Sequence, residues 1–255
     1  MKSLAIVGSG IAGLGLAYYL REKYQITIFE KNQHSGGHSN TVLLKEDTRF
    51  LPIDTGFMVF NRVTYPALCK LFAELDVPCK KTDMSFSVQE KRNGLEYAGA
   101  SFDRLFGDRR NIFNLRFWKM LLQLDRFNKE ALAALLDTDL SSKTLREFVA
   151  ERAYGEDFLN FYLIPMSSAV WSSPPEKMLD FPAAVLLRFF HNHGFLGMDT
   201  QHQWWTVEGG SREYVSRLLA KLGSSPRLNA GVRGLRRLRS SVEIELEDGS
   251  LHSFD

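Results

Sequence analysis

Three glycines near the amino terminus have the spacing of a phosphate-binding turn. Gly8 allows a tight turn, Gly10 lets the backbone approach a pyrophosphate, and Gly13 lets a helix pack closely on a sheet. Glu30 follows 17 residues after Gly13, where a carboxylate accepts hydrogen bonds from ribose hydroxyls and repels a 2′-phosphate, which disfavours NADP. The candidate nucleotide-binding residues in this part are Gly8, Gly10, Ile11, Ala12, Gly13 and Glu30.

The residues around this turn predict a strand, a helix and a second strand. The apolar run 4–7 is typical of a short strand buried on both faces. Residues 14–23 have helical spacing at Leu16, Tyr19 and Leu20, and residues 25–29 form a second apolar strand that ends at Glu30. A helix amino terminus presents free N–H groups and a positive dipole to phosphates. The pattern favours a dinucleotide site over a glycine-rich turn without a ligand, but its spacing does not separate FAD from NAD.

The residues after Glu30 carry a resemblance that does separate them. Lys31 is followed by a loop with Gly36, Gly37 and His38, which resembles the GGRxxT-like loop of the flavin amine oxidase, phytoene desaturase and protoporphyrinogen oxidase superfamily. That resemblance implies that Lys31 and the loop contact bound FAD. His38 stands where the family usually has arginine, and a neutral histidine is a weaker phosphate partner. Phosphate affinity is therefore expected to depend on pH. The alternative is a plain surface turn at the two glycines.

Three later segments extend the resemblance. Residues 53–58 resemble the family segment that passes the flavin ring, so Thr55, Gly56, Phe57 and Met58 are candidate cofactor-binding residues. Residues 205–211 resemble a second glycine pair that opens a helix near the flavin, with Ser211 as the expected N-cap. Residues 227–232 resemble the strand that places a valine beside the adenine, and Val232 is the candidate, although an ordinary strand valine is the alternative.

Several strings resemble one subgroup, the bacterial NAD/FAD-binding proteins related to the flavoprotein-like region of plant cyclopropane fatty acid synthases. These strings are residues 55–61, 83–87, 163–166 and 205–214. The resemblance implies an α/β fold, with a Rossmann-like FAD-binding domain of the GR2 type and an inserted, mostly helical substrate domain. The expected domains are residues 1–80 and 201–255 for FAD binding and 81–200 for the substrate. The family's C-terminal part, including its later sheet strand and flavin-closing motif, is expected to be missing after the hairpin at Asp248–Gly249.

The middle of the chain has helical patterns. Residues 111–136 predict a long amphipathic helix, and residues 144–151 predict a short helix with Thr144 and Glu147 in capping-box spacing. Residues 181–191 predict a third, with Pro182 in its first turn. Basic and aromatic residues alternate in the first of these, which would suit contact with an anionic membrane; a core face beside a solvated face is the alternative. The basic residues are Arg109, Arg110, Arg116, Lys119 and Arg126.

Composition limits the remaining functions. Lys and Arg number 32 against 30 Asp and Glu, and a net charge of +2 argues against a dedicated nucleic-acid binder. The 19 phenylalanines indicate a large apolar core, an apolar substrate chamber, or both. Cys69 and Cys79 lack metal-ligand spacing and are expected to be buried thiols in a reducing compartment. The uncharged residues 3–20 contain four glycines and precede no clear cleavage site, so a cytoplasmic protein is expected over a secreted one.

The sequence predicts an FAD-dependent, amine-oxidase-like oxidoreductase with non-covalent cofactor. Its flavin would accept a hydride from an apolar substrate, such as an acyl lipid, or from an amine. The alternatives are an isomerase without net redox change and a non-catalytic FAD-binding partner of a lipid-modifying enzyme in lipid metabolism. No catalytic residue is assigned, because no triad or carboxylate pair is present. Side chains that could line the chamber are Asn61, Tyr65, Trp171, His191, His193 and Trp204, with packing or helix capping as the alternative for the histidines and tryptophans.

Overall fold

The chain divides into two compact units, which are described separately. The computed structural model describes residues 1–91, 94–99, 101–197 and 200–255. Unit 1 comprises Met1–Thr82 and Trp204–Asp255, and unit 2 comprises Asp83–Gln203. The boundaries expected from the sequence, after residues 80 and 200, lie near these divisions. Unit 1 is therefore assembled from both ends of the chain.

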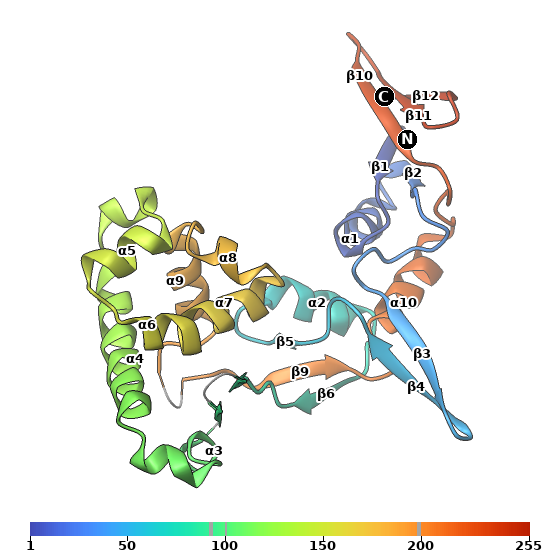
Figure 1. The fold of residues 1–255 in the computed structure, drawn as a ribbon. Coiled ribbons are helices and arrows are strands. Elements are labelled where there is room, and N and C mark those ends of the chain that lie inside the picture. The colour runs from blue at the N-terminus through green and yellow to red at the C-terminus, as the bar shows by residue number, and fades with distance from the viewer. Residues whose placement is uncertain (92–93, 100, 198–199) are drawn as a thin grey trace. The chain divides into compact units, whose positions relative to one another are not determined.

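Unit 1 begins with the predicted strand–helix–strand motif. Strand β1 (Lys2–Val7) pairs in parallel with β2 (Tyr24–Phe29), and the register runs from Lys2 opposite Tyr24 to Val7 opposite Phe29. Helix α1 (Ile11–Leu20) connects the two strands and packs against α10 (Arg212–Leu222) (Figure 1). A helical crossover is what two neighbouring parallel strands require. The mixed α/β fold with a Rossmann-like start is thus confirmed.

The buried face of this motif differs from the prediction in two ways. Leu16 and Tyr19 are 49% and 47% exposed, whereas Leu14 and Ala17 are fully buried. The prediction placed Leu16 and Tyr19 on the buried face, but that face is formed by Leu14, Gly15, Ala17 and Tyr18, and Gly13 lies close against the sheet. Val7 is 57% exposed, so β1 is not buried on both faces along its whole length. It leads directly into the glycine turn.

The remaining strands of unit 1 form a hairpin and two small sheets. Strands β3 (Thr41–Glu46) and β4 (Arg49–Asp54) make an antiparallel hairpin. A second sheet has the order β5-β9-β6, and a third has the order β10-β11-β12. The bounds are Phe60–Asn61 for β5, Cys79–Thr82 for β6, Trp204–Val207 for β9, Val232–Arg237 for β10, Val242–Leu246 for β11, Leu251–Phe254 for β12, and Pro66–Glu74 for α2.

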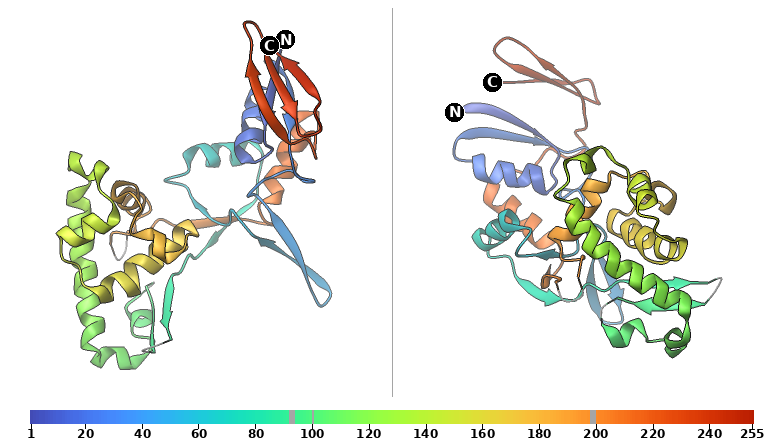
Figure 2. Two further views of the ribbon diagram at one scale, coloured as in Figure 1. Left: turned by 45° about the horizontal axis from the view of Figure 1, so that its top comes forward. Right: turned by 90° about the vertical axis from the view of Figure 1, so that its left-hand side faces the viewer.

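The two chain ends lie close together in unit 1 (Figure 2). The backbone N–H and the hydroxyl of Ser3 both donate to the Asp255 carboxylate, at 2.6 and 2.7 Å. Strand β12 contacts β1, and Phe254 packs against Phe29 at the end of β2. The predicted hairpin at Asp248–Gly249 is confirmed, with Gly249 at a φ of 84°. This small sheet therefore lies beside the two parallel strands.

Unit 2 is mostly helical and surrounds an aromatic core. The long helix α4 (Leu115–Ala134) contacts α6 and α9 (Figure 1), and Phe127 lies between the rings of Phe148 and Phe158. The other bounds are Ser87–Glu90 for β7, Leu95–Ala98 for β8, Phe102–Leu105 for α3, Arg109–Phe113 for η1, Thr138–Ser142 for η2, Leu145–Glu151 for α5, Glu156–Phe158 for α6, Leu159–Leu163 for the π-helical turn η3, Ile164–Trp171 for α7, Pro175–Met178 for α8, and Ala183–Asn192 for α9.

Three predicted helices of unit 2 exist with shifted boundaries. The helix expected over 111–136 is a 3₁₀ turn followed by α4, because the Asn114 side chain accepts from two backbone N–H groups and caps a new helix. The capping box of Thr144 and Glu147 is confirmed at the start of α5. Pro182 is the N-cap of α9 and not a first-turn residue.

Candidate functional site

The glycine turn is held by backbone contacts that exclude side chains. Gly8 has a φ of 94°, and its N–H donates to the Phe29 carbonyl at 2.7 Å. A Cβ on Gly13 would lie 2.0 Å from the Gly8 carbonyl oxygen, an impossible contact. A Cβ on Gly10 would meet nothing closer than the Gly36 carbonyl oxygen at 3.9 Å. Gly8 and Gly13 are therefore needed by the fold, whereas Gly10 leaves open space.

The start of α1 presents free donors and no negative charge. The first helical hydrogen bond runs from Leu14 N–H to the Gly10 carbonyl at 2.9 Å, so the N–H groups of Ile11, Ala12 and Gly13 have no acceptor within the helix. Gly10 supplies no side-chain cap, and the first turn contains no acidic residue. Because the helix dipole is positive here, this end of α1 suits an anion such as a diphosphate.

Glu30 lies directly behind the glycine turn, with 5% of its surface exposed. One carboxylate oxygen accepts from the Ser9 N–H and hydroxyl at 2.9 and 2.7 Å. The other accepts from the Asn32 N–H and side-chain amide, both at 2.9 Å. Burial alone would raise the pKa of Glu30, but the hydrogen bonds from Asn32 and Ser9 outweigh it and hold the pKa below its usual range. Glu30 is therefore a buried carboxylate whose two oxygens accept hydrogen bonds from Ser9 and Asn32.

The second glycine loop packs onto the first. The Gly36 N–H donates to the Ser9 carbonyl at 2.9 Å, and Gly10 and Gly36 form an isolated bridge. A Cβ on Gly37 would lie 3.3 Å from the Gly10 Cα. Both loop glycines have positive φ, 121° and 58°. The next residue, His38, is exposed, as is Lys31. The loop therefore brings His38 to the surface two residues after Gly36, which forms the bridge to Gly10.

The segment after β4 is joined to the same loop. The Phe57 N–H donates to the His38 carbonyl at 3.1 Å, and the Thr55 N–H donates to the Asn40 carbonyl at 2.9 Å. A Cβ on Gly56 would lie 2.2 Å from the His38 oxygen, so only glycine fits there. The Met58 side chain is 57% exposed. Residues 55–57 and 38–40 thus run side by side.

Val232 lies on the β10-β11-β12 sheet and not in the glycine turn or the loop of Gly36 and Gly37. It begins β10, pairs with Leu246, and packs against the buried cluster of Phe29, Ile244 and Leu246. The expected strand over 227–232 starts only at Val232, because the preceding residues instead bond to the end of β2. The Glu30 N–H donates to the Arg227 carbonyl at 2.9 Å, and the Ala230 N–H donates to the Glu30 carbonyl at 2.8 Å.

Sequence reasoning missed several polar residues of this region. Ser9 and Asn32 are the donors to Glu30. The sequence features that could have indicated them are the position of Ser9 between two glycines and that of Asn32 two residues after the acid. Ser211 was expected to cap α10, but its hydroxyl makes no cap hydrogen bond and donates to Asp54 at 2.7 Å. Tyr214 is 1% exposed, and its hydroxyl is hydrogen-bonded to that of Ser39. These last partners are far apart in sequence, so no local pattern marks them.

The chamber candidates from unit 1 have packing roles. Asn61 is fully buried, and its side-chain oxygen accepts from the N–H groups of Val63 and Thr64 at 3.0 and 2.8 Å. Trp204 is buried on β9, opposite Asn61 in the sheet. Burial raises the pKa of Tyr65. Asn61 and Trp204 thus lie on paired strands, and Tyr65 is the N-cap of α2.

The candidates from unit 2 are similarly placed. Trp171 packs against the rings of Phe181 and Phe189, and the His193 ring stacks on Phe189 with centroids 3.9 Å apart. Burial lowers the pKa of His193, and its Nδ1 lies 2.9 Å from the Phe189 carbonyl oxygen. His193 stands at the C-cap of α9, and His191 is exposed. None of these contacts assigns a catalytic role.

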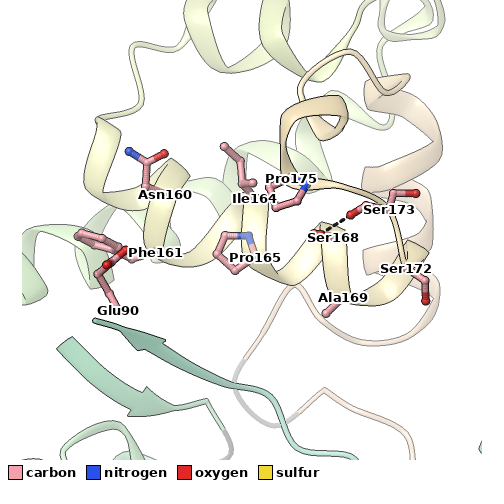
Figure 3. Close-up of a pocket in the computed structure, with 10 residues that line it drawn as sticks. All are labelled: Glu90, Asn160, Phe161, Ile164, Pro165, Ser168, Ala169, Ser172, Ser173 and Pro175. Atoms are coloured by element: carbon pink, nitrogen blue, oxygen red, sulfur yellow. Dashed lines mark hydrogen bonds between the residues drawn. The ribbon is translucent and has the colours of Figure 1, made fainter. Parts of the chain in front are cut away.

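Unit 2 contains a cavity of about 1020 Å³ beside α7. Figure 3 shows the π-helical turn at one end of it and α7 along its length. Ser172, at the end of α7, has a φ of 48°, and the Ser168 hydroxyl donates to the Ser173 carbonyl. The lining is mixed apolar and hydroxyl: Glu90, Asn160, Phe161, Ile164, Pro165, Ser168, Ala169, Ser172, Ser173 and Pro175. π-Helical turns occur frequently at functional sites.

The basic residues before and along α4 are largely engaged by acids. Arg109 pairs with Asp103 and Arg110 with Asp108, both at 2.7 Å. The remaining arginines pair similarly, Arg116 with Asp157 and Arg126 with Glu130. Apolar side chains are nevertheless exposed nearby, with Phe113 86% exposed. The positive charge expected to face an anionic membrane is thus offset by neighbouring carboxylates.

Two further features concern cysteines and metals. Cys69 and Cys79 are free and half-buried rather than fully buried, and burial raises the pKa of both thiols. In the described ranges, no group of three or more His, Cys, Asp or Glu side chains is arranged to bind a metal ion. Among the helices that the structure describes, none has both the length and the apolar character needed to cross a membrane.

The parallel strands, the glycine turn and the acid define a dinucleotide-binding α/β protein. The chain belongs to the family of flavin-containing amine oxidoreductases, whose model matches residues 11–255. FAD is the cofactor of this family, and its members are FAD-dependent oxidoreductases. The superfamily expected from the loop after Glu30 is thereby confirmed, whereas the relation to plant cyclopropane fatty acid synthases stays a prediction.

Known proteins of similar sequence or fold include a desaturase and two oxidases. The 1-hydroxycarotenoid 3,4-desaturase of Flavobacterium sp. (strain P99-3) is 49% identical over 107 residues, covering 40% of this chain and 20% of the desaturase. Cyclohexylamine oxidase from Brevibacterium oxydans IH-35A has a TM-score of 0.72 at 20% identity, over 99% of this chain and 56% of that chain. Putrescine oxidase bound to putrescine has a TM-score of 0.70 at 20% identity, with the same coverage.

A fatty acid isomerase from P. acnes, which produces CLA, has a TM-score of 0.65 at 16% identity, over 100% of this chain and 57% of that chain. At these identities the solved structures establish the fold. The chain spans slightly more than half the length of the solved structures and a fifth of the length of the desaturase.

Proposed function

We propose that this chain binds FAD non-covalently in unit 1 and belongs to an oxidoreductase that transfers a hydride from its substrate to the flavin. The observation that carries the proposal is the start of α1, with free N–H groups, no acid and no side-chain cap. Buried Glu30 lies on one side of it, and the loop of Gly36 and Gly37 packs against Gly10 on the other. An extended dinucleotide matches this arrangement, because its ribose hydroxyls would meet the carboxylate and its negatively charged diphosphate would meet the free N–H groups.

The ADP half of FAD is assigned to β1, α1 and β2. The N–H groups of Ile11, Ala12 and Gly13 would donate to the diphosphate, and the open space at Gly10 would admit it. Glu30 would accept from the ribose hydroxyls; since each of its oxygens already accepts two hydrogen bonds, the diol displaces the side-chain donors of Ser9 and Asn32. A carboxylate there repels a 2′-phosphate. Val232 and Lys31 are the proposed residues beside the adenosine.

The flavin half is assigned to the segments that follow the Gly10 contact. The bridge to Gly36 continues into Gly37 and His38, and the backbone of His38 is bonded to the turn of residues 55–58. The proposed contacts on this side are Gly36, Gly37, His38, Thr55, Gly56, Phe57 and Met58. Bound flavin supplies the hydride acceptor, while the chain orients the cofactor and excludes water.

The proposed substrate is apolar, such as an acyl or polyene chain. Two observations support it: the local identity to a hydroxycarotenoid desaturase, and the cavity beside α7, which combines Phe161, Ile164 and Pro165 with serine hydroxyls. An amine substrate is the competing assignment, because putrescine oxidase and cyclohexylamine oxidase share the fold. An isomerase without net redox change is a further candidate, favoured by the fold of the fatty acid isomerase.

The remaining parts of the proposal concern location and partners. Exposed apolar side chains at η1 and the start of α4, Phe113 and Leu115 among them, support peripheral contact with a membrane. A cytoplasmic location and a lipid-modifying enzyme as partner stay proposals from the sequence. If the chain served such a partner without catalysis, FAD would bind but no substrate would reduce it.

Anaerobic reduction distinguishes these possibilities. The FAD-loaded chain is mixed with acyl lipids, polyenes or amines while the flavin absorbance is recorded. Bleaching by an acyl or polyene substrate supports the proposal, and bleaching by amines alone would assign an amine oxidase. Conversion of a lipid to a product of unchanged mass, with the flavin oxidised at the end, would assign an isomerase. An FAD-loaded chain that none of these reduces or converts would contradict a catalytic role.

A further inference from the structure

Asp54, Thr41, Ser211 and the Arg212 N–H form one hydrogen-bonded group, here called the Asp54 cluster. One Asp54 oxygen accepts from the Thr41 hydroxyl at 2.6 Å and from the Ser211 N–H and hydroxyl at 2.8 and 2.7 Å. The Thr41 hydroxyl in turn accepts from the Arg212 N–H at 3.0 Å. Asp54 and Thr41 therefore cap the start of α10 from outside the helix, across 157 residues of sequence between Asp54 and Ser211.

The cluster joins three segments that are separate in sequence. Thr41 ends the loop that begins at Gly36, Asp54 precedes the turn of residues 55–58, and Ser211 starts α10. Gly210 completes the contact, since a Cβ there would lie 2.5 Å from Thr41 Cγ2 and 3.1 Å from an Asp54 oxygen. Tyr214, one turn into α10, repeats the connection by its bond to Ser39 and its ring contact with Phe57.

These segments lie along one half of the proposed ligand. Glu30 accepts from Ser9, and Gly10 follows Ser9 and bridges to Gly36. The His38 carbonyl accepts from the Phe57 N–H and lies close against Gly56. A linear dinucleotide with its ribose at Glu30 and its diphosphate at Gly10 must continue toward His38 and residues 55–58. No residue of the Asp54 cluster contacts Glu30 or Gly10 in the hydrogen bonds of the described residues.

We propose that Asp54 is a positioning residue for the flavin half of FAD. Its carboxylate fixes the turn of residues 55–58 against the loop of residues 36–41 and against α10, so that both segments are in place before FAD binds. The inference rests on the proposed function, because it assumes that FAD lies along these segments. Its consequence is selective: loss of the carboxylate weakens FAD binding and leaves ADP binding, which is assigned to β1, α1, β2 and the residues beside the adenosine, nearly unchanged.

Asp54→Asn tests the proposal in the cofactor-free chain. Asparagine keeps the size but loses the charge and one acceptor atom. Calorimetric titration with FAD and with ADP gives two dissociation constants for each protein. FAD affinity is expected to fall about ten- to a hundredfold, as for a lost charge-assisted hydrogen bond, with ADP affinity within about twofold of wild type. Asp47→Asn is the matched control, because Asp47 is an exposed acid in the same hairpin whose positive φ of 53° asparagine tolerates.

A second variant guards against a general folding defect. Thr41→Val removes one donor to Asp54 and the acceptor for Arg212 N–H while it keeps the carboxylate, so a smaller change in the same FAD-to-ADP ratio is expected. Equal losses of FAD and ADP affinity in both variants, or wild-type affinities in both, would overturn the proposal. A wild-type chain that binds neither ligand would instead contradict the proposed function itself. Circular dichroism of each variant verifies that the helices are intact.

Discussion

Two helices of unit 1 begin within two residues of a glycine, and they differ in what satisfies their first N–H groups. At α1, Gly10 is the N-cap, no side chain caps the helix, and no acid lies in the first turn. At α10, Gly210 precedes the helix, the Asp54 carboxylate accepts from Ser211, and Glu213 adds an acid to the first turn. Both starts have the same positive dipole. Among the described residues, a carboxylate accepts from the N-cap of α10, whereas at α1 the Glu30 carboxylate accepts from Ser9, one residue before the N-cap.

The difference separates a ligand-binding helix start from a structural one. Glycine before a helix allows close approach, but the approaching group at α10 is the chain itself, since a Cβ on Gly210 would strike Thr41. At Gly10 the nearest atom to such a Cβ is 3.9 Å away. The N–H groups of the first turn of α1 have no side-chain cap and no acid beside them in the turn, which leaves them for an anionic ligand.

The largest effect is expected from Gly13→Ala. The new Cβ would lie 2.0 Å from the Gly8 oxygen, a backbone contact that can only be relieved by moving α1 or the turn. We expect the free energy of unfolding to fall by about 3 kcal/mol, the upper end of common overpacking costs, and FAD binding to be lost. Urea denaturation followed by circular dichroism measures the first effect, and calorimetry measures the second.

Gly10→Ala is the control that separates fold from ligand. Gly10 has a φ of −69° and a ψ of 177°, which alanine adopts readily. Its unfolding free energy should stay within about 0.5 kcal/mol of wild type, while ADP and FAD affinities both fall because the methyl group fills the proposed diphosphate space. If Gly10→Ala bound ADP as tightly as wild type, the diphosphate would not lie at Gly10.

Ala12→Asp makes the start of α1 resemble that of α10. Ala12 is exposed in the first turn, so the acid should stabilise the helix slightly, by about 0.5 kcal/mol. It should also reduce ADP and FAD affinity about tenfold, because it repels the diphosphate. Titration at low and high salt measures both the loss and its screening. Ala12→Asn, of similar size but uncharged, should lose much less, and equal losses in the two variants would argue against an electrostatic cause.

Glu30→Gln tests the acid beside the turn. Because the folded-state pKa of Glu30 is lowered, its contribution to stability is full above the usual carboxyl pKa, near 4.3, and is lost as the pH falls through the lowered value. The variant should therefore be less stable than wild type at pH 7, by about 1–2 kcal/mol. The difference should shrink in acid. Urea titrations between pH 7 and pH 3 measure it, and the exposed Glu22→Gln is the control; a difference that grows in acid would have the wrong sign.

The smallest effect is expected from His38→Arg. A permanent guanidinium at this exposed position should strengthen FAD binding about two- to fivefold, the range of a solvent-exposed ion pair. Calorimetric titration of both proteins with FAD provides the comparison. Unchanged affinity would show that His38 does not contact a phosphate.

Local patterns in the sequence predicted the parts of the site that depend on neighbouring residues. The glycine spacing predicted the turn because Gly8 and Gly13, which contact each other, are only five residues apart. The strand that ends directly before Glu30 placed the acid beside Ser9. The capping box of α5 was predictable for the same reason. Hydrophobic spacing was less informative at α1, where Leu14, Ala17 and Tyr18, and not Leu16 and Tyr19, face the core.

The parts that escaped prediction depend on distant contacts. Asp54 was visible only as one residue of a family-like segment, since its partner Ser211 lies 157 residues away. Ser211 looked like an ordinary N-cap, and only the fold shows that its hydroxyl donates to another segment. The π-helical turn before α7 likewise has no simple sequence signature. Such contacts are set by tertiary packing, which one sequence does not display.

The most direct test of the central claim is the visible absorption spectrum of the purified chain, with the released cofactor identified after denaturation. The account predicts an oxidised flavin spectrum and one FAD per chain, either as purified or after reconstitution, with FAD released intact because it is not covalently attached. A colourless chain that takes up no FAD on reconstitution would contradict the account, as would a chain that releases NAD instead.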